Sequence, residues 1–526
     1  MMNTEEKSGA VSAPVTFGTP IFPQNQPENP SAGVPYRNPV KERIPIPFSR
    51  LDALFAALFL VCGYFFVWLI HPLNLGFGVT LFTLLFCGMV LVYCKKSDVV
   101  PGRANILWLV LVLLAALPFS LYTNAFLQFL NLILLMGLAV YWVASLCGTR
   151  LEPVLGRYFV PDLVNQLFQV PFRNFGCAPH LVKEGAVKNR RSKTLLSVLL
   201  GVLVSVPILG IVFSLLIQAD TNFQHMVQGM LDRIGPEIGS FLLRLLPAFL
   251  TGSYLFGLLY GNVKKRNLDV VSAEKADAAA EKALRLPPAF SVTVMTLMIA
   301  VYALFFSSQS ATLLGAFQGR PPEGFTYAEY ARRGFFELCQ VVFINMAVML
   351  CAHLFTRRDS PKGLRICNIV LSVETVFLIV TALSKMVLYI NQYGLTQKRV
   401  YTSFFMALLL VVFVLIIAAQ FVRFNLTRSV VLTACISFLV LCCSNADGLI
   451  AQYNVDRYLN GTLKNVDVLA LYTTSDAARP AALRLLRETQ DAGMKADLSE
   501  FYENRAQRSI PFQEMNLQRL INQNQK

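Results

Sequence analysis

Apolar stretches long enough to cross a membrane recur along the chain between residues 51 and 445. A helix needs about 20 apolar residues to span the hydrocarbon core of a bilayer, because it rises only about 1.5 Å per residue. We therefore predict an all-α integral membrane protein with about eleven transmembrane helices, of which the third and the eleventh are the shortest. The predicted spans are 51–70, 73–94, 106–122, 126–147, 195–217, 241–261, 289–308, 335–355, 366–389, 402–422 and 429–445.

The basic residues between these spans alternate from one side to the other. Six alternate loops together hold 26 Lys and Arg residues, whereas the five loops between them hold 6. Short cytoplasmic loops are enriched in Lys and Arg. The distribution therefore predicts an N-terminus inside and a C-terminal tail outside. The basic loops are 41–50, 95–105, 148–194, 263–288, 357–365 and 423–428.

This topology divides the chain into three predicted regions. Residues 1–48 are rich in Pro, Asn, Ser and Gly, which predicts a disordered cytoplasmic N-terminal segment. Residues 49–445 form the multi-pass transmembrane domain. Residues 446–526 contain helix signals near 478–488, 496–507 and 511–522, which predict a small helical extracytoplasmic tail domain.

Two loop segments, 223–234 and 161–175, have apolar residues at helical spacing. Each is predicted either to lie along a membrane interface or to pack on the helix bundle. In the sixth span, Gly257 and Gly261 form a GxxxG pair, which permits close approach of another helix.

Composition supports a membrane protein and narrows its chemistry. Hydrophobic residues make up 55% of the chain and charged residues only 15%, well below the roughly 25% of soluble proteins. The net charge of +15 resides in the short loops, so it does not indicate nucleic-acid binding. No phosphate-binding loop, metal-ligand spacing or nucleophile motif stands out. We expect no catalytic residue, metal or cofactor, with the lipid bilayer as the surrounding partner.

Ionisable residues inside the eighth and ninth spans form the first candidate site. Glu374 and Lys385 lie eleven residues apart, which returns to nearly the same face of a helix. Such residues at membrane depth are candidates for a substrate or ion pathway, but they also snorkel or hold bundles together. Glu337 is predicted to reach the depth of Lys385. Completing the candidate intramembrane set are Asn345 of the eighth span and Arg244 of the sixth.

Three further stretches resemble an uncharacterised family of bacterial multi-pass membrane proteins, the domain of unknown function 4153/4173. They read FTYAEYARRGFFEL from Phe325 to Leu338, YGLTQKRVYT from Tyr393 to Thr402, and NADGLIAQYNVDRY from Asn445 to Tyr458. Residues 475–483 are similar to the tail pattern of that family. The resemblance covers roughly residues 195 to 490. It implies a protein of the bacterial cytoplasmic (inner) membrane and assigns no activity.

All of these stretches fall on the predicted outer side. Charged residues within them are candidates for an extracytoplasmic working face that contacts the tail, an envelope protein partner or a ligand. The alternative is that they cap helices and pack loops. The candidate outer-face residues are Glu329, Arg332, Arg333, Lys398, Arg399, Asp456 and Arg457.

Three functions remain open on the sequence. The first is a membrane-embedded regulatory, sensing or scaffold component that acts through its outer face. The second is a transporter or channel that uses the polar stripe of the eighth and ninth spans. A membrane enzyme ranks third, because the sequence shows no nucleophile, acid–base pair or metal site.

Overall fold

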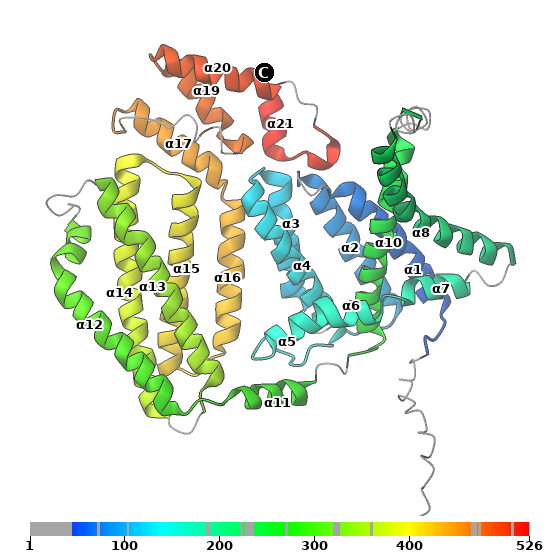
Figure 1. Cartoon of the computed structure of the whole chain (residues 1–526), viewed down its shortest axis with the longest axis horizontal. Coiled ribbons are helices and arrows are strands. Elements are labelled where there is room, and N and C mark those ends of the chain that lie inside the picture. Colours follow the sequence, from blue (N-terminus) through cyan, green and yellow to red (C-terminus); the bar gives the residue numbers. More distant parts are fainter. Residues whose placement is uncertain are drawn as a thin grey trace, which may run out of the picture. The chain divides into compact units, whose positions relative to one another are not determined.

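The protein is described from a computed structural model, in which residues 48–526 form one compact unit (Figure 1). The described residues form helices and no β-sheet, apart from one isolated bridge between Leu286 and Thr356. The predicted all-α fold is therefore confirmed. The described residues are 45–70, 74–101, 105–185, 190–220, 225–226, 236–268, 272–318, 327–357, 361–463, 471, 475–506 and 510–524.

Within these residues, nine helices are long and apolar enough to cross a membrane. Each overlaps one of the predicted spans, because a long apolar stretch satisfies its backbone in lipid only as a helix. They are α1 (Arg50–Leu69), α2 (Phe77–Lys96), α4 (Ala125–Cys147), α10 (Pro236–Val263), α12 (Pro288–Gln318), α13 (Tyr327–Phe355), α14 (Pro361–Tyr393), α15 (Gln397–Phe421) and α16 (Leu426–Cys443).

Two predicted spans correspond to helices outside this set. The third span is α3 (Asn105–Leu121), a 17-residue helix that contains Pro118. The fifth lies in α8 (Arg190–Ala219), whose described apolar part is the short segment Ile208–Ala219. The protein is thus a multi-pass helical membrane protein, and the count of eleven spans stays a prediction. So does the disordered segment 1–48, which lies outside the described residues except for 45–48.

Helices α1 and α10 form the centre of a first helix group and pack closely. A Cβ atom built on Gly63 would lie 2.1 Å from the carbonyl oxygen of Ala248, and one on Gly252 would lie 2.6 Å from that of Phe59. Only glycine permits this approach of two backbones. Against the pair pack α2, α4, the short α6 (Val170–Arg173) and α7 (Cys177–Gly185), and α3 packs on α2 and α4.

Helices α12 to α15 form a second group with its own apolar core. Phe335 of α13, Leu371 and Ile379 of α14, and Phe413 of α15 are almost completely buried in it. Helix α16 packs against α15 of this group and against α3 and α4 of the first group. The first and second groups are therefore joined through α16.

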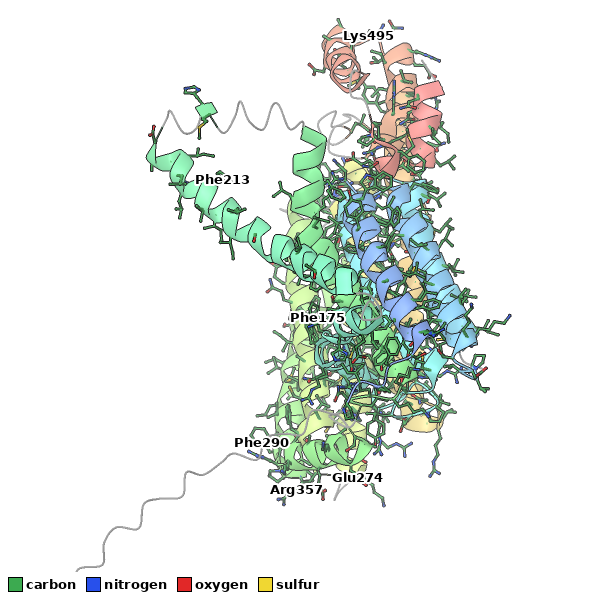
Figure 2. The ribbon with its side chains drawn as sticks, turned by 90° about the vertical axis from the view of Figure 1, so that its right-hand side faces the viewer. Phe175, Phe213, Glu274, Phe290, Arg357 and Lys495 are labelled. Carbon is green, nitrogen blue, oxygen red and sulfur yellow. The ribbon has the colours of Figure 1, made fainter. Side chains whose placement is uncertain are left out.

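The loops between the helices are held at two different ends. At one end, Leu286 pairs with Phe355 and Arg357 through backbone hydrogen bonds, and α11 (Ala273–Ala283) lies at the same end, where Figure 2 labels Glu274, Phe290 and Arg357. At the other end, the backbone N–H of Phe77 donates to the carbonyl of Met515 in the tail, at 2.9 Å. We call the end that contains Leu286 and Arg357 the opposite end, and the end that contains Phe77 and Met515 the tail end. The described residues of the basic loops lie toward the opposite end, and which end faces the cytoplasm stays a prediction.

Short helices make up the tail. They enclose a small core that includes Ala451, Val455, Ala482 and Leu485. The tail contains helices near the three positions predicted from the sequence, which are 478–488, 496–507 and 511–522. The division of the chain into domains stays a prediction. The tail elements are α17 (Ala446–Leu459), the 3₁₀ turn η3 (Asp476–Ala478), α19 (Arg479–Glu488), α20 (Ala492–Ala506), the 3₁₀ turn η4 (Phe512–Glu514) and α21 (Leu517–Asn524).

The two predicted amphipathic segments differ in what can be said of them. Of residues 223–234, only 225–226 are described. Residues 159–173 form α5 (Phe159–Val164), the π-helical turn η1 (Asn165–Gln169) and α6, and they pack at the opposite end beside α10. The predicted GxxxG pair serves this contact, because a Cβ on Gly257 would lie 2.7 Å from the carbonyl oxygen of Pro171.

Candidate functional site

A buried carboxylate, Asp447 of α17, ties the tail to two loops of the helix groups. Its Oδ2 accepts hydrogen bonds from Asn124 Nδ2 at 2.9 Å and from the backbone N–H of Ser475 at 3.0 Å. Its Oδ1 accepts one from Gln397 Nε2 at 2.7 Å. Asp447 is 2% exposed. Neutral donors from three distant segments thus solvate a buried charge, which is the condition for keeping it inside a protein.

The start of α17 positions this carboxylate. Asn445 takes a left-handed backbone conformation (φ +51°), which Asn tolerates better than most residues. Its Oδ1 accepts a hydrogen bond from the N–H of Gly448 at 3.3 Å and so caps the helix. Asp447 follows in the first turn, where the helix dipole stabilises a negative charge.

A second contact fixes the loop between α14 and α15. Gly394 has φ +73°, and a Cβ there would lie 2.5 Å from Asn454 Oδ1. The side chain of Asn454 accepts from the N–H of Leu395 and donates to its carbonyl, both at 2.7 Å. Glycine is therefore required by both the backbone conformation and the close approach of Asn454.

Two of the predicted outer-face residues hold the same loop. Arg399 donates to the carbonyls of Tyr393 at 3.0 Å and Gly394 at 2.6 Å, and its guanidinium lies 4.1 Å from the ring centroid of Tyr389. Arg457 donates to the carbonyl of Ile390 at 3.4 Å. Both cations therefore neutralise the C-terminal end of α14. These contacts agree with the alternative that the residues cap helices and pack loops.

Beside Asp447 the tail contains a cleft of about 310 Å³. Asp456 forms an ion pair at its edge with Arg484 of α19, which also pairs with Glu488 at 3.0 Å. Hydrogen bonding to Glu488, and then to Asp456, raises the pKa of the Arg484 guanidinium. Lining the cleft between these charges are Asn445, Gly448, Leu449, Gln452, Pro480 and Gln518.

The remaining predicted outer-face residues are less informative. Lys398 is exposed in the first turn of α15. Glu329, Arg332 and Arg333 fall on α13, but their side chains lie outside the described part of the chain. Asp456 and Arg457 are neighbours in sequence, yet the structure gives them different partners.

The predicted intramembrane stripe contains a hydrogen-bonded network between three helices. Tyr302 of α12 donates to Asn345 Oδ1 at 2.6 Å, and Asn345 Nδ2 donates to Thr375 Oγ1 at 2.8 Å. Thr375 donates in turn to the carbonyl of Leu371 at 2.6 Å. The completely buried Asn345 is thereby satisfied, as a structural polar contact inside a bundle requires.

Glu374, next to Thr375 on α14, is only partly satisfied. The residue is partly buried, and its Oε2 is buried without a hydrogen-bond partner among the described residues. The structure thus places Glu374 beside the network of Asn345 but does not include it in that network.

Lys385 lies three turns further along α14 and is 6% exposed. Its Nζ packs on the backbone of α13, because a Cβ on Gly334 would lie 2.1 Å from it. Glu337, three residues after Gly334, acts on this ammonium electrostatically. The predicted pairing of Glu337 with Lys385 stays a prediction. Arg244 lies on α10 in the first helix group, so it is not part of this cluster.

Sequence reasoning missed the two most buried carboxylates of the described residues. Asp447 was included in a family-like stretch but not singled out. At the opposite end, Asp52 is 1% exposed and pairs with Lys264 Nζ at 3.0 Å, while Tyr93 donates to it at 2.8 Å. Each carboxylate lies next to the end of an apolar stretch, where a single acidic residue is easily taken for a boundary. Among the described residues, no three His, Cys, Asp or Glu side chains gather to hold a metal ion.

Long apolar helices, a helical tail and a buried junction between them define a multi-pass helical membrane protein. The chain belongs to the family of the domain of unknown function 4153 (DUF4153), whose sequence pattern matches residues 109–485. The resemblance seen in the sequence is thus confirmed, and the match begins earlier than residue 195. Neither a curated protein nor a solved structure matches the chain.

Proposed function

We propose that the protein is a membrane-embedded scaffold or sensing component of the bacterial cytoplasmic membrane, with its tail end as an extracytoplasmic working face. The observation that carries the proposal is the junction at Asp447, which joins the tail to the loops at Asn124 and Gln397. A tail that is fixed in this way transmits binding at its surface to the membrane helices.

The cleft beside the junction supports a partner-binding role. Its volume of about 310 Å³ lies at the lower end of the range of ligand sites, roughly 300–1,000 Å³. Leu449 is 56% exposed at its wall, between the amide of Gln452 and the Asp456–Arg484 pair. An apolar anchor with flanking amides and charges suits a segment of an envelope protein.

Site-specific cross-linking tests the partner-binding role. A photo-reactive amino acid at Gln452, which is exposed in the cleft, should give one discrete adduct with an envelope protein in living cells. The same amino acid at Lys495 of α20, exposed in the tail but outside the cleft lining, is the matched control (Figure 2). Leu449→Arg should abolish the Gln452 adduct. Equal adduct patterns at Gln452 and Lys495 would contradict the proposal.

The proposed orientation needs a separate measurement. Cysteine introduced at Lys495 should react in intact cells with a maleimide that cannot cross the membrane. Cysteine at Lys96, exposed at the end of α2, should react only after the cells are opened. Reaction of Lys96→Cys in intact cells would reverse the orientation and place the tail in the cytoplasm.

A second candidate function is transport along the stripe of α13 and α14. Glu374 favours it, since its Oε2 is buried and has no hydrogen-bond partner among the described residues. Intramembrane carboxylates of this kind bind ions or carry protons. Glu374→Gln should then abolish the cellular phenotype while the protein still assembles. Loss of assembly in both Glu374→Gln and Glu374→Ala would show that Glu374 is structural.

A further inference from the structure

A cavity of about 680 Å³ lies within the first helix group, between α1, α2, α4, α6 and α10. Its size is that of a site for a small organic molecule. Apolar side chains form nearly all of the lining, among them Phe82, Leu135, Met136, Phe172 and Leu255. Such a surface selects an apolar occupant, because a polar one would lose its hydrogen bonds to water.

The few hydroxyl groups in the lining do not change this character. Thr83 Oγ1 donates to the carbonyl of Val79 at 2.8 Å, and the Tyr254 hydroxyl donates to that of Leu167 at 2.8 Å. These two donors are thus used within the protein, and the third hydroxyl group of the lining belongs to Thr251.

The cavity follows the direction of the helices. Its lining includes Val79 to Phe86 along α2 and Leu250 to Leu258 along α10. These spacings of seven and eight residues correspond to about 10–12 Å along a helix axis. Because α1, α2, α4 and α10 have the length and composition of membrane spans, the cavity lies at the depth of the lipid acyl chains.

Residues 159–175 close the cavity at the opposite end, and one side of this segment is suited to contact with lipid. Residues Leu167, Phe172 and Phe175 of this segment line the cavity, and Figure 2 labels Phe175. Along its outer side runs an exposed apolar stripe at four-residue spacing, and four of its polar residues are buried. The stripe is Val160, Val164, Phe168 and Phe172, and the buried polar residues are Asp162, Asn165, Gln166 and Asn174.

An exposed apolar side on an amphipathic segment of a membrane protein is covered by lipid or by another protein chain. Phe172 belongs both to the stripe and to the cavity lining, so it connects the cavity with the surrounding lipid.

Basic groups lie at this end of the cavity. Arg173 is exposed directly after Phe172. Asn174 holds the loop after α10 against the segment, because its Nδ2 donates to the carbonyl of Arg266 at 3.3 Å and its Oδ1 accepts from Asn267 at 3.1 Å. Lys265, in that loop, is exposed. Two cations beside an apolar cavity match the charge of an anionic headgroup.

We propose that this cavity binds one acyl chain of an anionic phospholipid, with the phosphate headgroup at Arg173 and Lys265. The apolar lining, the direction of the cavity and the exposed apolar stripe account for the binding of the acyl chain. The two cations account for the headgroup.

The test uses the full chain in phosphatidylcholine vesicles that contain a small fraction of phosphatidylglycerol with a diazirine in its acyl chain. After irradiation, label should appear at cavity-lining positions such as Met136 and Leu167. Ala139→Trp places an indole in the cavity and should lower this labelling on the order of tenfold, since it takes the space of the chain. Ile133→Trp, on the lipid-exposed side of the same helix and outside the lining, is the matched control and should label like the wild type.

A second arm tests the headgroup. In the doubly substituted Arg173→Gln, Lys265→Gln protein, phosphatidylglycerol and phosphatidylcholine probes should label the cavity equally, whereas the wild type should prefer phosphatidylglycerol. Equal loss of label in Ala139→Trp and Ile133→Trp, or no loss in either, would overturn the proposal. So would cavity cross-links to a second copy of the chain instead of lipid. Leu255→Trp, a second filling variant, decides the case if Ala139→Trp does not assemble.

Discussion

The two ends of the helices each contain a buried aspartate, and the two are stabilised in different ways. Asp52 pairs with a cation, Lys264, and accepts a hydrogen bond from Tyr93. Asp447 instead accepts hydrogen bonds from two side-chain amides and one backbone N–H. In the first arrangement a cation neutralises the carboxylate charge, whereas in the second the dipoles of three neutral donors stabilise it.

The difference reflects what each aspartate joins. Asp52 connects α1 to the ends of α2 and α10, where the lysine side chain is one-third exposed and can reach water. Asp447 connects the tail to loops before α4 and α15, and no cation takes part in the hydrogen bonds it accepts. We infer that the opposite end is held by an ion pair and the tail end by a polar junction specific to three loops.

The largest effect is expected from Lys264→Met. It leaves Asp52 buried without its cation, a change that typically costs about 3–5 kcal/mol. Thermal unfolding in detergent should show a large loss of stability, with the exposed neighbour Lys265→Met as control. Asp52→Asn should cost less, because the remaining lysine can hydrate. The reverse order of the two losses would contradict the ion-pair description.

Asp447→Ala should rank second. It leaves the amides of Asn124 and Gln397 and the N–H of Ser475 without their acceptor, which costs about 1–3 kcal/mol for such buried groups. Hydrogen exchange should rise in α17 and α19 while the helix groups stay protected. Asp456→Ala, on the same helix but in an exposed pair, is the control and should leave exchange unchanged. Faster exchange throughout the protein would mean that the junction does more than hold the tail.

A third buried carboxylate sharpens the comparison, because Asp162 of α5 has neither type of full compensation. Among the described residues, its oxygens accept only the backbone N–H of Leu151, at 3.0 and 3.3 Å, and burial raises its pKa from 3.8 to about 6. The folded state then holds the proton more tightly than the unfolded state. This contribution to stability is full below pH 4 and is lost as the pH rises through about 6, on the order of 3 kcal/mol.

The measurement is the unfolding temperature of wild type and Asp162→Asn at pH 4.5 and pH 7.5. The difference between the two proteins should favour the wild type at the lower pH and shift toward the variant at the higher one. A difference that does not depend on pH would show that Asp162 is ionised throughout.

The smallest effect on stability is expected from Arg484→Ala. Its partners Asp456 and Glu488 are solvent-accessible, and exposed ion pairs contribute little. The unfolding temperature should stay unchanged, but the cross-link from Gln452 should weaken, because Arg484 lines the cleft. A large loss of stability would make the Asp456–Arg484 pair part of the junction itself.

The helices could be predicted well from the sequence because the bilayer imposes their length. The span expected at 126–147 is α4 (Ala125–Cys147), and that expected at 402–422 lies within α15 (Gln397–Phe421) except for its last residue. The helical character of residues 161–175 was also visible. The sequence did not reveal which side of this segment faces the bundle, because its buried side is polar and departs from the usual pattern of soluble helices.

The junction could not be predicted in the same way. The donors to Asp447 lie 323, 50 and 28 residues away in the sequence, and no local pattern connects them. Asp456 and Arg457 were grouped because they are adjacent. Consecutive helical residues point in directions about 100° apart, however, so one reaches Arg484 and the other the end of α14.

The proposed working face depends on a tail that Asp447 holds in place. The most direct measurement is therefore to cross-link from Gln452 in cells that express the wild type, Asp447→Ala or Glu374→Gln, and to identify the adduct. We predict one envelope-protein adduct in the wild type and in Glu374→Gln, and its loss in Asp447→Ala. An adduct that survives Asp447→Ala but disappears in Glu374→Gln would contradict the proposal and favour a role for the intramembrane stripe.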